Sequence, residues 1–118
     1  MIIFYRLHSI VYSQYILRLI YIQEDEDIKF QEEYKRQLLH ALGKVIKNQR
    51  TLRKKGINKL SFEYDIGNGL LSKLEKGLAD TKITTVWKLA NAFGYKCSDF
   101  IKIVEQELPK DFDFYNQG

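Results

Sequence analysis

Cysteine, proline and histidine are scarce in this chain of 118 residues, which has one cysteine, one proline and two histidines. The single cysteine, Cys97, cannot form an internal disulfide, and no C-x-x-C or Cys/His spacing typical of zinc sites occurs. We therefore expect no metal site, and we interpret Cys97 as a small buried side chain in a protein of the reducing cytoplasm. Because Pro109 is the one proline, most of the chain is free to be helical.

The residue combinations that catalysis needs are also missing. His8 and His40 lie in separate segments, and no serine or cysteine has a partner at the spacing of a known catalytic motif. A glycine-rich phosphate loop is absent from the sequence as well. We therefore expect neither an enzyme nor a cofactor.

The N-terminal extension, residues 1–23, is apolar but contains no long uninterrupted hydrophobic run. Arg6 and Arg18 are among the polar residues that interrupt it, and no small-residue cleavage site follows, so we expect neither a membrane span nor a signal peptide. Its isoleucine and aromatic content favours strands, for instance Ile2–Val11 and Tyr15–Ile22. The extension could pair with a second subunit, bind another protein, or be an upstream in-frame translation without a selected role.

Positive charge is concentrated in the middle of the chain. The net charge of the chain is +4. Between Ala41 and Lys102 there are thirteen Lys or Arg and five Asp or Glu, and the segments on both sides are acidic. A basic middle suits a polyanionic partner, because each cation placed on a phosphate releases condensed counterions. A solvated helix face is the alternative that charge alone leaves open.

A periodic apolar pattern follows an acidic cluster at Glu24–Asp27. Acidic residues favour a helix N-terminus, where Asp27 could cap free backbone amides. Apolar residues then recur every four positions, which predicts one helical face made of Phe30, Tyr34, Leu38, Leu42 and Ile46. Two lysines followed by a glycine at positions 54–56 predict the end of this helix near Lys54.

Two short helices joined by a tight turn at Asp65–Gly67 are predicted between Gly56 and Gly77. The side chains that can face inward are Leu60, Ser61 and Tyr64 from the first helix and Leu71 and Leu74 from the second. Farther along, helical periodicity predicts two more apolar faces, one of Val86, Leu89, Ala90 and Phe93 and another of Phe100, Ile103 and Val104.

The segment from Gly56 to Gly77 resembles the helix-turn-helix of the XRE family, the Cro and lambda-repressor type. The family pattern is L-A, three residues, G-V-S, three residues, I-S, one residue, I/L-E, one residue and G, and the chain follows it without a gap at Leu60, Ser61, Ile66, Leu71, Ser72, Leu74, Glu75 and Gly77. Similarity continues upstream at Leu42–Gly43, Ile46–Lys47 and Arg50, and downstream at Ile83–Val86, Lys88–Gly94 and Ser98–Phe100.

The resemblance implies an all-α fold, a five-helix lambda-repressor-like DNA-binding domain at residues 38–104. An acidic lead-in at residues 24–37 and the N-terminal extension would precede this domain, and a C-terminal tail at residues 105–118 would follow it.

The resemblance also implies a sequence-specific transcription regulator, a repressor, that binds double-stranded DNA as a homodimer with residues 68–76 in the major groove. Asparagine can pair with adenine and lysine with guanine, a leucine can touch a thymine methyl, and a glycine has no side chain to read a base. The candidate base-contacting residues are Asn68, Gly69, Leu70 and Lys73. The candidate phosphate-contacting residues are Arg50, Asn58, Lys59, Ser72, Lys76 and Lys82.

Three residues depart from the family pattern. Asp65 replaces the usual turn glycine, although aspartate tolerates the left-handed conformation better than most residues. Gly67 replaces the serine that often caps the recognition helix, which leaves Asn68 as an alternative cap. Ile57 stands where a glutamine often touches DNA, so that contact is not carried over.

Arg50 and Glu75 match a pair that in this family joins the first helix to the end of the recognition helix. An arginine held by a carboxylate could still reach a phosphate and so couple the fold to the docked orientation. The alternative is an exposed ion pair worth about 0 to 1 kcal/mol.

A protein-interaction module with secondary DNA binding, such as an antitoxin, is the main alternative function. Both the N-terminal extension and the C-terminal tail could bind a protein partner. A salt-dependent affinity for duplex DNA would favour the regulator, and its absence would favour the interaction module.

Overall fold

The computed structural model describes residues 32–112 of the chain. The described residues from Tyr34 onward belong to one compact unit, and a second unit, Met1–Glu33, contributes only Glu32 and Glu33 to the described part. The strands expected within residues 1–23, the cap expected at Asp27 and the side chain of Phe30 therefore lie outside the described residues.

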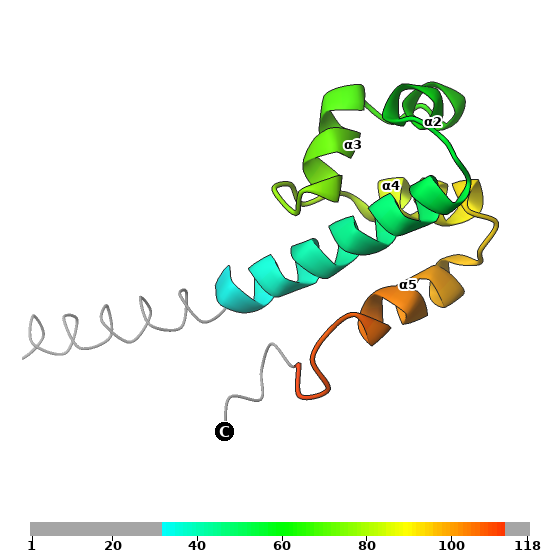
Figure 1. The fold of residues 1–118 in the computed structure, drawn as a ribbon. Helices are drawn as coiled ribbons and strands as arrows, with labels where there is room; N and C mark the ends of the chain where they lie inside the picture. Colours follow the sequence, from blue (N-terminus) through cyan, green and yellow to red (C-terminus); the bar gives the residue numbers. More distant parts are fainter. Residues whose placement is uncertain (1–31, 113–118) are drawn as a thin grey trace, which may run out of the picture. The chain divides into compact units, whose positions relative to one another are not determined.

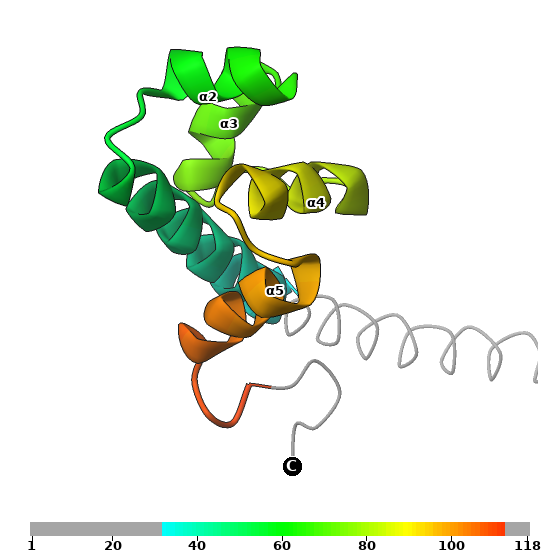
Figure 2. The same cartoon turned by 90° about the vertical axis from the view of Figure 1, so that its right-hand side faces the viewer.

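Five helices and no strand make up residues 32–112, which confirms the predicted all-α fold. We call residues 32–52 the long helix, and it is followed by α2 (Ile57–Tyr64), α3 (Asn68–Glu75), α4 (Ile83–Ala92) and α5 (Cys97–Gln106). Helix α2 packs on α3 and on α4, and α4 packs on α5. Figures 1 and 2 show α4 between the α2–α3 pair and α5 in both views. Within the described residues, no helix is both long and apolar enough to cross a membrane.

Left-handed backbone conformations end the first helices. The long helix ends at Leu52, close to the predicted position, but the residue with the positive φ is Lys54, at 54°, and not Gly56. Gly56 instead has a φ of −75° and precedes α2. Asp65, which takes the place of the family's turn glycine, has a φ of 52° at the end of α2, as its short polar side chain permits.

The predicted inward faces of the helices meet in one core. Ile46, Leu60, Leu71, Leu74, Leu89 and Phe100 are its largest fully buried side chains. Cys97 is buried in the same core, as predicted. Ala41 and Val45 of the long helix, which the pattern of four-residue repeats did not include, are also buried.

Residues on both sides of the expected domain at 38–104 contribute to its packing. The amine of Lys44, on the long helix, lies 3.0 Å from a carboxylate oxygen of Glu107 and forms an ion pair with it. Leu108 packs against the core, and the rings of Tyr34 and Phe112 meet edge to face with centroids 5.4 Å apart. The first residues after α5 thus fold back onto the long helix.

Candidate nucleic-acid interface

A largely buried ion pair joins the long helix to the end of α3. Arg50 donates from Nε to one carboxylate oxygen of Glu75 at 2.7 Å and from a terminal nitrogen to the other at 2.9 Å. The remaining terminal nitrogen donates to the backbone oxygen of Lys55 at 2.7 Å. The side chains are only 15% and 6% exposed, so the exposed-pair alternative is wrong. The hydrogen bond to Glu75 raises the pKa of Arg50, and all three of its side-chain nitrogens serve the fold.

The long helix also crosses α3 at very short range. A Cβ atom at Gly43 would lie 2.8 Å from the backbone oxygen of Glu75 and closer still to that of Leu74. Real Cβ atoms essentially never approach other atoms so closely, so glycine is required at this crossing. The same end of α3 is therefore held by a backbone contact at Gly43 and by the ion pair at Arg50.

The turn between α2 and α3 is held from both sides. The hydroxyl of Ser61 donates to the backbone oxygen of Ile66, and the backbone N–H of Ile66 donates to the backbone oxygen of Ser61 at 3.0 Å. From α4, the amine of Lys88 donates to the backbone oxygen of Asp65 at 3.2 Å. These bonds fix the angle between the two helices, although Asp65 replaces a glycine.

Asn68 is the first helical residue of α3, and it does not cap the helix. Gly67 occupies the N-cap position, and no side chain bonds to the free amides of the first turn. The amide of Asn68 instead donates to the amide oxygen of Asn58 at 2.6 Å. The capping alternative is therefore wrong, because Asn68 lies inside the helix and its side chain links the N-terminal ends of α3 and α2.

The outward face of α3 is polar and free of ion pairs among the described residues. Asn68, Gly69, Lys73 and Lys76 are exposed, whereas Ser72 and Leu70 are partly buried and Leu70 packs against the core. The structure thus brings the predicted residues of α3 onto one helix, with Asn58 beside its first residue. Their contacts with DNA stay a prediction.

The other two predicted phosphate-contacting lysines lie on neighbouring elements. Lys59 is exposed on α2, where its amine is 4.0 Å from the carboxylate of Glu63. Lys82 is exposed at the N-cap position of α4 and makes no side-chain capping bond. Neither lysine is held in a tight ion pair, so both amines can reach a phosphate.

A comparison with protein-family models gives a match over residues 46–100 to the helix-turn-helix family. This match supports the XRE-type helix-turn-helix domain that the sequence predicts. Its helix-turn-helix unit is α2, the turn at Asp65–Gly67 and α3. Comparisons with curated proteins and with solved structures give no significant match. The family assigns the domain a DNA-binding, transcription-regulating kind of function.

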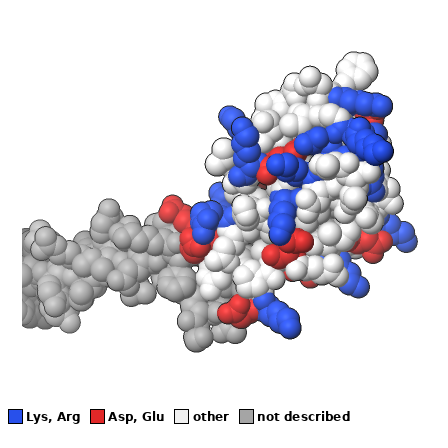
Figure 3. Space-filling model, in the orientation of Figure 1, with Lys and Arg blue, Asp and Glu red and all other residues white. Residues whose placement is uncertain are grey.

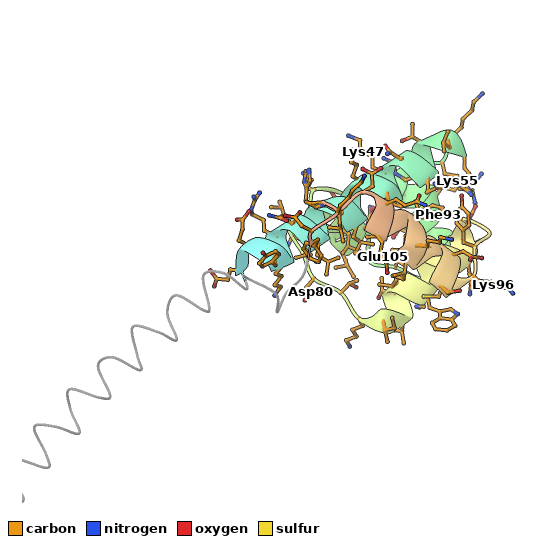
Figure 4. All side chains as sticks on the ribbon, turned by 90° about the horizontal axis from the view of Figure 1, so that it is seen from below. Lys47, Lys55, Asp80, Phe93, Lys96 and Glu105 are labelled. Atoms are coloured by element: carbon orange, nitrogen blue, oxygen red, sulfur yellow. The ribbon has the colours of Figure 1, made fainter. Side chains whose placement is uncertain are left out.

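Basic side chains of the helix-turn-helix domain are unevenly spread over its surface. In Figure 3, Lys and Arg gather over the end of the molecule that α2 and α3 form, and Asp and Glu are more frequent below it. Lys55, which is partly buried, is paired with Glu63 at 2.7 Å, and its hydrogen bond lowers the pKa of that carboxyl.

One structural cluster of the helix-turn-helix domain escaped the sequence analysis. Arg53 donates to the backbone oxygen of Phe93 and, at 2.8 Å, to the amide oxygen of Gln49. Its guanidinium lies 5.1 Å from the ring centre of Phe93 and 5.8 Å from that of Tyr95. Arg53 therefore fastens the end of the long helix to the turn between α4 and α5, and its charge contributes to the fold.

Proposed function

We propose that the protein is a sequence-specific repressor that binds double-stranded DNA in the cytoplasm as a homodimer. The observation that carries the proposal is the outward face of α3, where Asn68 and Lys73 are exposed on a helix whose last residue, Glu75, is held to the long helix by Arg50. A helix held in this way can enter the major groove in one orientation. Repression needs no chemistry beyond occupancy of the operator.

Base reading is assigned to the start and middle of α3. Asn58 accepts one N–H of Asn68, so the second N–H and the amide oxygen of Asn68 are left for an adenine edge. Lys73, exposed one turn after Gly69, can donate to the O6 and N7 atoms of guanine. Asn58 acts here as a positioning residue, because its bond sets the rotation of the Asn68 amide.

Phosphate binding is assigned to residues around this centre. Three exposed lysines flank the proposed reading face: Lys59 on α2, Lys76 just after α3 and Lys82 just before α4. The hydroxyl of Ser72 and the free N–H groups of Asn58 can add neutral hydrogen bonds. Arg50 serves the fold in this proposal, because its nitrogens are already bonded within the protein.

Lys73→Ala should flatten base preference, whereas Lys76→Ala should weaken binding to all sequences. The first change removes a base contact and should cost roughly 1 to 3 kcal/mol on the preferred site. The second removes a phosphate contact and should lower by about one the slope of log Kd against log salt concentration, which we call the salt slope. Selection of bound sites from a random duplex pool, followed by Kd measurements at several salt concentrations, separates the two effects.

Lys102→Ala is the matched control for the loss of one charge, because Lys102 is exposed on α5. It should leave base preference unchanged. If Lys73→Ala kept the preference and lowered only the salt slope, α3 would not lie in the groove as proposed. A wild-type protein without salt-dependent affinity for duplex DNA would favour the interaction-module alternative.

The homodimer is proposed to form through the groove between α4 and α5. Trp87, which is 55% exposed, and Ile101 provide its apolar lining, and Lys96 and Glu105 carry opposite charges at the two ends of α5. No ion pair joins Lys96 or Glu105 to another described residue. In a two-fold interface a contact of one residue with a second residue of the partner is repeated with the roles exchanged, so a face with one charge of each sign away from the axis can be self-complementary.

Lys96→Glu and Glu105→Lys should each weaken self-association by at least about tenfold, because each change brings like charges together across the two-fold axis. An equimolar mixture of the two variants should recover association, since both pairs between unlike chains are then attractive. Sedimentation equilibrium over a concentration series measures this. A mixture that associates no better than either variant alone would place the dimer interface elsewhere.

A further inference from the structure

Five of the six glycines in residues 32–112 have a structural explanation. Gly43 lies at the close crossing with α3, and Gly77 and Gly94 have φ values of 71° and 80°, which side chains rarely adopt. Gly56 and Gly67 occupy N-cap positions, where glycine is well tolerated.

Gly69 is the exception among these glycines. It is the second residue of α3, it is exposed, and its φ lies outside the left-handed region. A Cβ atom built on it would meet nothing within 4 Å. Glycine within a helix is less favourable than alanine, because it loses more backbone freedom on folding. The fold alone would therefore be better served by alanine at this position.

The surroundings of Gly69 indicate what its bare backbone faces. Asn68 precedes it, and the amide of Asn68 is drawn towards Asn58 by their hydrogen bond. Lys73 lies one helical turn further on the same side of α3. Gly69 is thus a gap of side-chain size on the outward face of the helix, between two polar side chains. We call it the Gly69 notch.

We propose that the Gly69 notch receives the methyl group of a thymine and that Gly69 is a specificity-determining residue. The backbone N–H of Gly69 belongs to the uncapped first turn and runs roughly along the helix axis. The surface at the missing side chain is therefore the α-carbon with its hydrogens, which fits an apolar base group that projects into the major groove. The C5-methyl of thymine is the one such group that standard base pairs present there. The inference rests on the proposed function, namely that α3 enters the major groove.

The inference is tested by adding a methyl group to the protein at Gly69 and by removing methyl groups from the thymines of the DNA. The wild-type chain first selects its preferred duplex from a random pool. Each thymine of a half-site is then replaced singly by deoxyuridine, which lacks the C5-methyl, and the Kd is measured for wild type and for Gly69→Ala. One replacement should weaken wild-type binding about fourfold, the value of one buried methyl group.

Gly69→Ala should bind the thymine duplex roughly tenfold more weakly than wild type, because the added methyl overfills the notch. On the duplex with deoxyuridine at that one position, the variant should recover to within a few fold of wild type. Its melting temperature should be equal to or above that of wild type, which shows that the loss is not one of folding. Asn48→Ala, an exposed change to a better helix former on the long helix, should leave binding unchanged.

Three results would overturn the inference. Gly69→Ala could bind the thymine duplex as wild type does, or it could lose the same factor on thymine and deoxyuridine duplexes. Either result removes the notch but leaves the proposed function intact, because the wild type still selects a site. A wild-type chain that selects no site would overturn the proposed function and the inference with it.

Discussion

Arg50→Ala should lower the free energy of unfolding by about 3 to 5 kcal/mol, a large part of the stability of a small domain. The change leaves the carboxylate of Glu75, only 6% exposed, without its two hydrogen-bond donors. It also removes the bond to the backbone oxygen of Lys55, which supports the chain just after the long helix. Urea unfolding followed by circular dichroism gives the value.

Lys35→Ala is the matched control, because Lys35 forms a 3.7 Å ion pair with Asp80 whose side chains are 55% and 64% exposed. Its loss should cost less than about 1 kcal/mol. A double-mutant cycle of Arg50→Ala with Glu75→Ala should show strong coupling, since each single change leaves the other side chain largely buried without its charged partner. An Arg50→Ala variant as stable as Lys35→Ala would show that the pair does not hold α3.

Gly43→Ala should lower the free energy of unfolding by about 3 kcal/mol, although alanine is a better helix former than glycine. The added Cβ would overlap the backbone oxygens of Leu74 and Glu75. Neither oxygen can turn away, because both belong to the helical backbone of α3. The two helices would have to separate, which would weaken the packing of Leu74 and stretch the bonds between Arg50 and Glu75. Thermal and urea unfolding measure the loss.

Gly69→Ala is the control for this second change. It also adds a methyl group to a helix, but the added Cβ would meet nothing within 4 Å. It should raise the free energy of unfolding by about 0.5 to 1 kcal/mol. The two glycine variants should therefore differ in sign. If Gly43→Ala were also stabilising, the long helix and α3 would be farther apart than the structure has them.

The sequence predicted those features that are local or periodic. The end of the long helix, the turn at Asp65–Gly67 and the inward side chains of α2 and α3 all follow from spacing and from residues with special backbone preferences. The pair of Arg50 and Glu75 was also predicted, but only through the resemblance to the XRE family. Nothing in a single sequence shows that two residues so far apart in the chain meet.

Contacts between distant elements were the ones that the sequence could not reveal. The interaction of Arg53 with Phe93 and Tyr95 depends on how the turn after α4 meets the long helix, and no motif encodes that approach. The bond between Asn58 and Asn68 depends in the same way on the angle between α2 and α3. Because that angle was unknown, helix capping was an equally reasonable use of Asn68.

Helix α3 is held more firmly at its last turn than at its first. Gly43 and Arg50 hold its last residues, Leu74 and Glu75, whereas the first turn lacks a side-chain cap and is exposed at Asn68 and Gly69. Local opening of the helix should therefore begin at the first turn, where little buried contact opposes it. In the proposed complex this is the end that meets the bases, so binding must order it at a cost in conformational entropy. The same local freedom lets the side chains of the first turn adjust to grooves of slightly different width, while the turn before α3 and the contacts at its far end keep the helix axis in place.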